Sequence, residues 1–289
     1  MSRRSGLASL IAAVSVLILA AGFVYLRGGS TPVSVGSAVE RYRGQRQVAL
    51  REDVATPGPA SRYAPDRAEA EAVQVDATTE VTSADGVRPL PAEGVYVYAT
   101  TGGDEVDVLG GSRHEYPAET TITVRHAGCG LVERWDALEE RWDERESCRT
   151  PGGDTLKRTT SFHEFFGRGD LRTLQCSGVT YPAGFQPGSS WASRCASENT
   201  TVSLTLRAVG WENVDVDGQS VRTMHVHVEG RITGEQDGTT VRDVWGSADT
   251  GIVVRERSTL TSYSNQPVFG RTRYHESYEN RLTSLDPRN

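Results

Sequence analysis

Several signatures of catalytic and metal-binding proteins are missing from this 289-residue sequence. None of its four cysteines belongs to a C-x2-C pair, so a zinc site made of four cysteines is not indicated. There is no G-x-S-x-G turn for a serine nucleophile and no Walker lysine for a phosphate-binding loop. The 31 Lys and Arg residues are outnumbered by 38 Asp and Glu residues, and the net charge of −7 argues against electrostatic binding to nucleic acid or to an anionic membrane surface.

A run of 21 residues without charge, Gly6–Leu26, follows Arg3 and Arg4 near the N-terminus. As a helix it is long enough to span the roughly 30 Å hydrocarbon core of a bilayer, and its positive flank places the N-terminus in the cytoplasm. A cleaved signal peptide is the alternative, but its apolar region is usually about 7–15 residues long. We therefore predict that residues 1–27 form a cytoplasmic tip and an uncleaved single-pass plasma-membrane anchor, with the rest of the chain extracytoplasmic.

The four cysteines agree with an oxidising, extracytoplasmic compartment, where disulfides persist. They form two pairs with the same separation of 19 residues, Cys129 with Cys148 and Cys176 with Cys195. Four cysteines allow three connectivities, and equal local spacing favours the pairing of neighbours. The sequence therefore predicts two local disulfides.

The sequence changes character at about residue 90. Residues 28–90 are rich in Ala, Gly, Pro, Ser and charges without sustained apolar periodicity, which predicts a low-order, flexible tether, in which a short helical patch such as 39–50 would have little to bury. Residues 91–289 consist of short β-branched and aromatic runs separated by Gly, Asp and Asn, which is typical of an all-β domain. The connections are mostly too short for crossover helices. We predict a mainly antiparallel meander, curled into one sheet or half-barrel.

The stretch RWDALEERWD repeats Arg-Trp-Asp seven residues apart. On a helix its i, i+4 charge pairs would all be of like sign and destabilising. An antiparallel hairpin that turns after Leu138 instead places Trp135 opposite Trp142 and Cys129 opposite Cys148. The charges and the cysteines thus favour a structural hairpin. The functional alternative is that the two tryptophans form an exposed aromatic platform for a ligand.

The stretch MHVHVEG places His225, His227 and Glu229 on one face of a strand, because side chains alternate with period two. Two histidines so placed could share a metal ion, with a third ligand from His163 or His275. Neither of these has a spacing tied to the pair. A polar, solvent-facing strand face explains the pattern equally, and we assign no metal site.

The residues GVYVYATTGGDEVDVLGGSRHEYP, HEFFG, PGSSW and TGIVVRE carry a resemblance to known proteins. Over approximately residues 93–260 the chain resembles a family of uncharacterised, membrane-anchored actinobacterial proteins, whose members have no known activity. It is more distantly similar to envelope proteins with a half-barrel sheet, including the lipoprotein-carrier families. That second resemblance implies an apolar concave face that can hold acyl chains.

These observations lead to three hypotheses. The first is a non-enzymatic, membrane-anchored extracytoplasmic binding module, with a concave site for an apolar or lipid-like ligand. The second is a cell-envelope protein–protein interaction module, and the third is a metal-dependent hydrolase, which rests only on unlinked His and acidic residues. The sequence indicates no catalytic residue, no cofactor and no nucleic-acid partner. The candidate ligand-binding residues are aromatics expected to alternate onto sheet faces: Tyr96, Tyr98, Trp135, Trp142 and Trp245.

Overall fold

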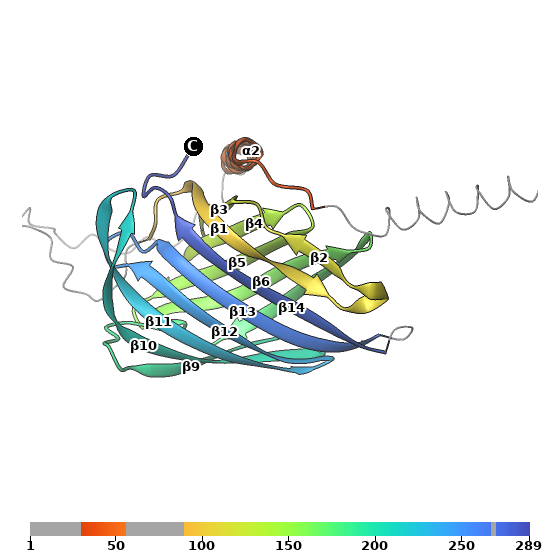
Figure 1. The fold of residues 1–289 in the computed structure, drawn as a ribbon. Coiled ribbons are helices and arrows are strands. Elements are labelled where there is room, and N and C mark those ends of the chain that lie inside the picture. The colour runs from red at the N-terminus through yellow and green to blue at the C-terminus, as the bar shows by residue number, and fades with distance from the viewer. Residues whose placement is uncertain (1–29, 56–89, 267–269) are drawn as a thin grey trace, which may run out of the picture.

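The computed structural model describes residues 30–55, 90–266 and 270–289. These residues form the helix α2 (Val35–Ala55), a short 3-10 turn at Val108–Gly110 and a 14-stranded antiparallel sheet (Figure 1). The strands are β1 Gly94–Val106, β2 Ser112–Glu115, β3 Glu119–Ala127, β4 Gly130–Leu138, β5 Arg141–Thr150, β6 Gly153–Phe165, β7 Arg168–Ser177, β8 Tyr181–Pro182, β9 Ser190–Ala196, β10 Thr200–Val216, β11 Gln219–Gly234, β12 Gln236–Ser247, β13 Val253–Gln266 and β14 Gly270–Leu282.

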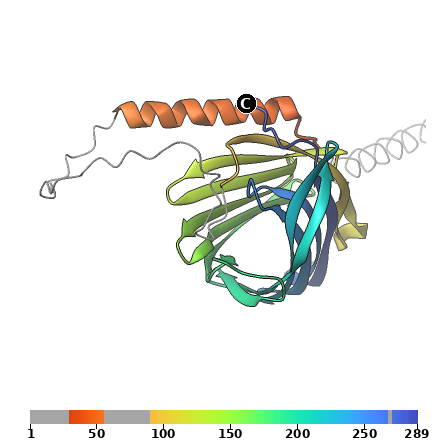
Figure 2. The ribbon, with the colours of Figure 1, turned by 90° about the vertical axis from the view of Figure 1, so that its left-hand side faces the viewer.

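The first strand closes the sheet into a barrel, because β1 has partners on both sides. It pairs with β3 through residues 94–99 and with β14, the last strand, through residues 98–106. Twelve strands thus follow one another around a ring (Figure 2), while β2 and β8 add short pairings to β1 and β6. At the closing pair, a Cβ on Gly102 would lie 2.1 Å from the Ser277 carbonyl oxygen, so only glycine allows this approach. The predicted antiparallel all-β fold is confirmed, and the sheet closes completely.

The Arg-Trp-Asp repeat forms the β4–β5 hairpin, but the predicted register is wrong by one residue. Trp135 lies opposite Asp143, and Trp142 lies opposite Asp136. The turn is Glu139–Glu140, and the pairing shifts between Asp136 and Leu138. A slip of one residue moves a side chain to the other face of a sheet. The two tryptophans therefore lie on opposite faces and form no common platform.

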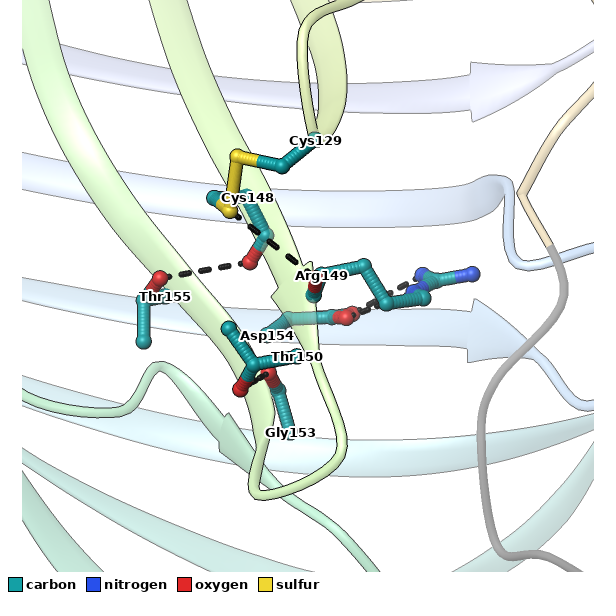
Figure 3. Close-up of a disulfide and its surroundings, with 7 residues drawn as sticks. All are labelled: Cys129, Cys148, Arg149, Thr150, Gly153, Asp154 and Thr155. Carbon is teal, nitrogen blue, oxygen red and sulfur yellow. Dashed lines mark hydrogen bonds and ion pairs between the residues drawn. A yellow bond between two sulfur atoms is a disulfide. The ribbon is translucent and has the colours of Figure 1, made fainter. Parts of the chain in front are cut away.

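Both predicted disulfides are confirmed. Cys129 precedes β4 and bonds to Cys148 near the end of β5, beside a turn closed by an Arg149–Asp154 ion pair of 2.7 Å (Figure 3). Cys176 and Cys195 lie directly opposite each other where β7 meets β9. That contact is short, since only residues 175–177 pair with residues 194–196. The second disulfide therefore joins the barrel at the shortest pairing between neighbouring strands of the ring.

The helix α2 occupies part of the segment that the composition predicts as a low-order tether. Its first turns and the residues before it pack on the outside of the barrel, where Val33, Ala38 and Tyr42 form a buried cluster with Val95 of β1. Arg41 also forms an ion pair of 2.9 Å with Asp136. The apolar residues are too few and too spread for a strong periodic signal, so the packing depends on a surface that the sheet supplies.

The predicted membrane anchor, Gly6–Leu26, lies outside the residues that the structure describes. Within the described ranges, α2 does not have the length and apolar character needed to cross a membrane.

Candidate functional site

One face of every strand lines the interior of the barrel, and strand register identifies which side chains lie there. Directly opposed residues project on the same side of a sheet. A continuous row of opposed residues on the inner face runs through Trp191, Leu206, Val228, Arg242, Ser258 and Tyr278. The row passes from apolar side chains on β9–β11 to polar side chains on β12–β14. The interior therefore has two chemically different sides.

The apolar side, which we call the apolar wall, comes from β9, β10 and β11. Its buried members are Leu204, Leu206, Ala208, Met224, Val226 and Val228. Three half-buried aromatic residues, Tyr181, Phe185 and Trp191, pack against them, with ring centroids 5.2–6.4 Å apart. Tyr181 and Phe185 belong to the segment enclosed by the second disulfide. The Pro and Gly content of that segment indicated only a loop, so its aromatic contribution to the interior was missed.

The other side, which we call the ionic wall, is formed by Arg141, Asp143 and Arg145 of β5 with Glu256 of β13 and Glu276 of β14. Arg141 donates to Glu276 at 2.8 Å and to Asp143 at 2.8 Å. The strands β5 and β14 are separated by β4, β3 and β1 around the ring, so the Arg141–Glu276 pair spans the interior. Tyr116 also donates a hydrogen bond to Glu276. These side-chain contacts link β5 and β14, which are not neighbours in the sheet, across the interior.

A second bridge of the ionic wall centres on Glu256. Its carboxylate accepts a hydrogen bond from Tyr278 at 3.1 Å and lies 3.4 Å from Arg145 and 3.5 Å from Arg242. Burial by itself would raise the pKa of Glu256, but the nearby arginines and the tyrosine hydroxyl outweigh it and lower that pKa. Glu256 is therefore ionised and belongs to a charge network of two arginines. The adjoining pocket, lined in part by Trp135 and Asp143, has about 30 Å³.

A buried carboxylate–histidine cluster lies at the β1 side of the interior. Asp104 lies 2.9 Å from His114 Nδ1 and accepts a hydrogen bond from Tyr274 at 3.1 Å. Burial opposes ionisation, but the hydrogen bond with His114, together with His163 at 3.8 Å and the charge of Arg141, outweighs it and holds the pKa of Asp104 at about 2. His114 is only 1 % exposed and stacks on Phe165. A substrate could reach this imidazole only if the packing opened, so the cluster acts as part of the core.

The five candidate binding residues do not come together in one site. Tyr96 and Tyr98 belong to one core cluster with Trp245, and they donate to the carbonyl oxygens of Ala92 and Val253. Trp245 donates from its indole nitrogen to Glu212, on the outer face. Their contacts are with the protein's own core. The periodic pattern identified buried aromatic side chains, but it did not distinguish packing from binding.

The two candidate tryptophans of the repeat have separate surroundings. Trp135 is buried in the interior, where it stacks against Tyr278 with centroids 4.5 Å apart and borders the pocket next to Glu256. Trp142 is half-buried on the outer face, where it stacks on Phe162 beneath Arg134. Of the five candidates, Trp135 lies closest to the ionic wall.

The histidine pair considered for metal binding lies on the outer face, as its alternation predicts. His225 Nε2 and His227 Nδ1 lie 2.8 and 2.9 Å from the same oxygen of Asp243, and His225 Nδ1 lies 2.9 Å from Glu212. Burial of Asp243 is outweighed by these two histidines, which lower its pKa. In the described part of the chain, no group of three His, Cys, Asp or Glu side chains is arranged to hold a metal ion.

The third ligands considered for that site lie elsewhere. His163 belongs to the buried Asp104 cluster, and His275 pairs with Thr261 on β13 at 2.9 Å. Glu229 lies 3.5 Å from His227 at the edge of the pair. The histidines are therefore held by carboxylates and hydroxyls on three different parts of the barrel.

A broad surface hollow of about 640 Å³ lies beside the β1–β2 hairpin. Its charged residues are already paired, since Arg273 contacts Glu105 at 2.9 Å and its backbone N–H donates to Asp107. The hollow is far larger than the pocket beside Glu256, but its charges neutralise one another at an exposed hairpin. The interior walls therefore remain the stronger candidate site.

Two solved structures resemble part of this chain. No protein-family model matches the chain, and no curated protein matches it significantly. Among solved structures, the hypothetical lipoprotein YmcC from Escherichia coli K12 is similar with a TM-score of 0.31 and 13% identity, over 66% of this chain and 88% of that chain. A candidate lipoprotein from Parabacteroides distasonis is similar with a TM-score of 0.29 and 11% identity, over 68% of this chain and 96% of that chain.

Proposed function

We propose that this protein is a membrane-anchored, extracytoplasmic binding module without enzymatic activity, whose barrel interior binds a lipid-like molecule with an anionic head group. The observation that carries the proposal is the inner cross-strand row in which Arg242 follows directly on Trp191, Leu206 and Val228. An apolar tail can lie along the apolar wall while its head group meets the arginine. Burial of the tail supplies affinity, and the arginine supplies orientation.

Arg242 is suited to such a head group because its guanidinium has an N–H donor without a hydrogen-bond partner among the described residues. Its Nε is buried without a hydrogen-bond partner in the described structure, and its Nη1 lies 3.5 Å from Glu256. Glu256 keeps Arg145 and Tyr278 as partners when Arg242 turns toward a ligand. A guanidinium presents its donors in a planar fork that matches a carboxylate or a phosphate.

Two further observations support the location and the absence of catalysis. The charge-free segment Gly6–Leu26 has the length of a membrane anchor, and both disulfides suit an oxidising compartment. The imidazole of the buried Asp104–His114 pair is enclosed by packing. A general base has to come within hydrogen-bond reach of its substrate.

The test is native mass spectrometry of the full-length chain, produced in an oxidising compartment and released from detergent. We expect a bound lipid or fatty acid at one molecule per chain, and saturable binding of added oleate. Replacing Arg242 by Met should weaken oleate binding by about tenfold or more, since hydrogen bonds to charged groups contribute roughly 1.5–3 kcal/mol. The matched control is Arg257→Met on the exposed outer face of the next strand, which should leave binding unchanged.

Absence of both a co-purified lipid and oleate binding would refute the proposal. It would leave interaction with another envelope protein as the working hypothesis. Elemental analysis of the same sample tests the metal-dependent hydrolase, because that hypothesis requires a stoichiometric transition metal.

A further inference from the structure

The strand β7 has an edge that the barrel does not use. It pairs with β6 through residues 168–175 but with β9 only through residues 175–177. In the described ranges no strand lies against the other side of residues 168–174. Gly169, Leu171 and Thr173 are exposed along it, and the Leu171 side chain is 60% exposed. An unpaired strand edge presents N–H and C=O groups that can pair with another chain.

The hairpin turn determines which backbone groups point to the free side. Phe166 and Gly167 form a two-residue turn with φ angles of 56° and 69°, so Phe165 and Arg168 form a hydrogen-bonded pair. Hydrogen-bonded and non-hydrogen-bonded pairs then alternate along the ladder. The alternation directs the N–H and C=O groups of Gly169, Leu171 and Thr173 away from β6. Three residues of β7 therefore offer donors and acceptors to solvent.

The pairing of β7 with β9 agrees with this alternation. Cys176 and Cys195 have Cα atoms 3.9 Å apart, which fits the closer, non-hydrogen-bonded kind of pair. Cys176 therefore directs its backbone groups to β6, as the even-numbered residues do. The backbone geometry of the free edge thus follows from both ends of the strand.

The side chains of this edge are complementary to themselves. When two copies of β7 lie antiparallel about Leu171, Gly169 faces Thr173 of the other copy and Leu171 faces Leu171. Asp170 then faces Arg172 of the other copy, twice by symmetry. The Asp170–Arg172 pair lies on non-hydrogen-bonded positions, where opposed side chains are closest. Within one chain Arg172 already reaches Asp170 at 2.6 Å, and the register places both side chains on the inner face of β7.

An apolar strip on the outer face continues this contact. Leu171 lies opposite Phe162 of β6, and Phe162 lies opposite Trp142 of β5. Phe162 and Trp142 stack with centroids 5.7 Å apart and are half-buried. A second copy would cover the exposed end of this strip with its own Leu171. The contact is isologous, as expected for a two-fold dimer.

We propose that the free edge of β7 joins two copies of this chain into an antiparallel, two-fold dimer centred on Leu171. The shared ladder makes backbone hydrogen bonds through residues 169, 171 and 173, with two Asp170–Arg172 ion pairs on its inner face and the Leu171 pair on its outer face. The proposal does not rest on the ligand proposal, because the shared ladder uses the backbone of β7, although Asp170 and Arg172 lie on the inner face in the same cross-strand rows as Arg141 and Asp143 of the ionic wall. The dimer would give the anchored protein a continuous sheet across two barrels.

Sedimentation velocity of the full-length chain in density-matched detergent tests the proposal through charge reversal. Wild-type protein should sediment as a dimer in the micromolar range. Asp170→Arg alone, or Arg172→Asp alone, places like charges opposite each other twice, and should raise the dimer dissociation constant about tenfold or more. The double variant Asp170→Arg/Arg172→Asp restores opposite charges and should restore the dimer. The matched control is Asp237→Arg, which reverses an exposed ion pair elsewhere on the barrel.

A second variant separates loss of pairing from loss of folding. Thr173→Pro removes an N–H that faces the free side and leaves the β6–β7 ladder intact, since proline is tolerated where the N–H faces away from the sheet. This variant should keep the wild-type circular dichroism spectrum and sediment as a monomer. Any of three results would overturn the proposal: the wild-type protein is monomeric at about 100 μM, the single charge reversals leave the dimer dissociation constant unchanged, or the double variant remains monomeric.

Discussion

Replacing Arg141 by Met tests whether the ionic wall holds the barrel together across its interior. The Arg141 side chain is 3% exposed and contacts Glu276, which is 5% exposed, and Asp143. Burial by itself would lower the pKa of Arg141, but Asp143 and Glu276 outweigh it and raise that pKa well above its usual value. The substitution leaves these two carboxylates in the interior without their shared cation, and Asp104 adds a third nearby negative charge.

The size of the effect follows from the burial of both partners. Removing one partner of a buried ion pair usually costs about 3–5 kcal/mol. For a protein of this size, about 1 kcal/mol changes the melting temperature by roughly 2–4 °C, so the expected loss is about 6–20 °C. The double variant Arg141→Met/Glu276→Met should recover part of this loss, because it removes one of the two carboxylates that lose their cation, while Asp143 remains.

The assay is thermal and urea unfolding followed by near-ultraviolet circular dichroism. Arg271→Met is the matched control, since Arg271 pairs with Asp237 on the exposed surface and both side chains are more than half exposed. An exposed pair contributes about 1 kcal/mol or less. Equal stability losses in the Arg141 and Arg271 variants would refute the idea that the interior pair is structurally important.

Three further predictions concern acid, redox state and the two tryptophans. Asp104 has a folded-state pKa of about 2, below its unfolded value, so its contribution to stability is present above about pH 4 and is lost as pH falls towards 2. The melting temperature of the wild-type protein should therefore fall between about pH 4 and pH 2, and it should fall more steeply than the melting temperature of the Asp104→Asn variant. Replacing both Cys176 and Cys195 by Ser should lower the free energy of unfolding by about 3 kcal/mol and accelerate hydrogen exchange at the short β7–β9 pairing. Unchanged exchange there would show that the disulfide is not needed to hold β7 and β9 together. Trp135→Ala should cost about 3–5 kcal/mol as a buried aromatic truncation, whereas Trp142→Ala on the outer face should cost clearly less; equal losses would argue against their placement on opposite faces.

The hairpin illustrates how far local sequence patterns reach. Opposed charges and the spacing of Cys129 and Cys148 were enough to predict an antiparallel hairpin and its disulfide. They were not enough to predict the register, because the bulge near Ala137 and the turn at Glu139–Glu140 shift the pairing by one residue. Ala137 is fully buried, and its packing is a tertiary property. The aromatic-platform alternative fails because the shift puts the two tryptophans on opposite faces and because Trp135 is buried.

The candidate site shows a similar division. The aromatic residues predicted for binding are mostly buried, and their partners come from strands far away in the sequence. Arg242 carried no signal in the sequence, since a single arginine in the strand TTVRDVW matches no motif. Its significance comes from register, which places it beside Val228 and within reach of Glu256. The aromatic residues Tyr181 and Phe185 were hidden in the same way, inside an apparent loop.

By itself the sequence determined the strand-rich domain, the antiparallel order of its neighbours and the pairing of its cysteines, because each depends on residues close together in the chain. Closure of the barrel depended on β1 meeting β14, a contact between the two ends of the domain that no local pattern encodes. The ionic bridges across the interior and the packing of α2 on the outer surface are consequences of that closure. Long-range pairing and burial exist only after the sheet has formed, so the tertiary structure alone decided which side chains face one another inside it.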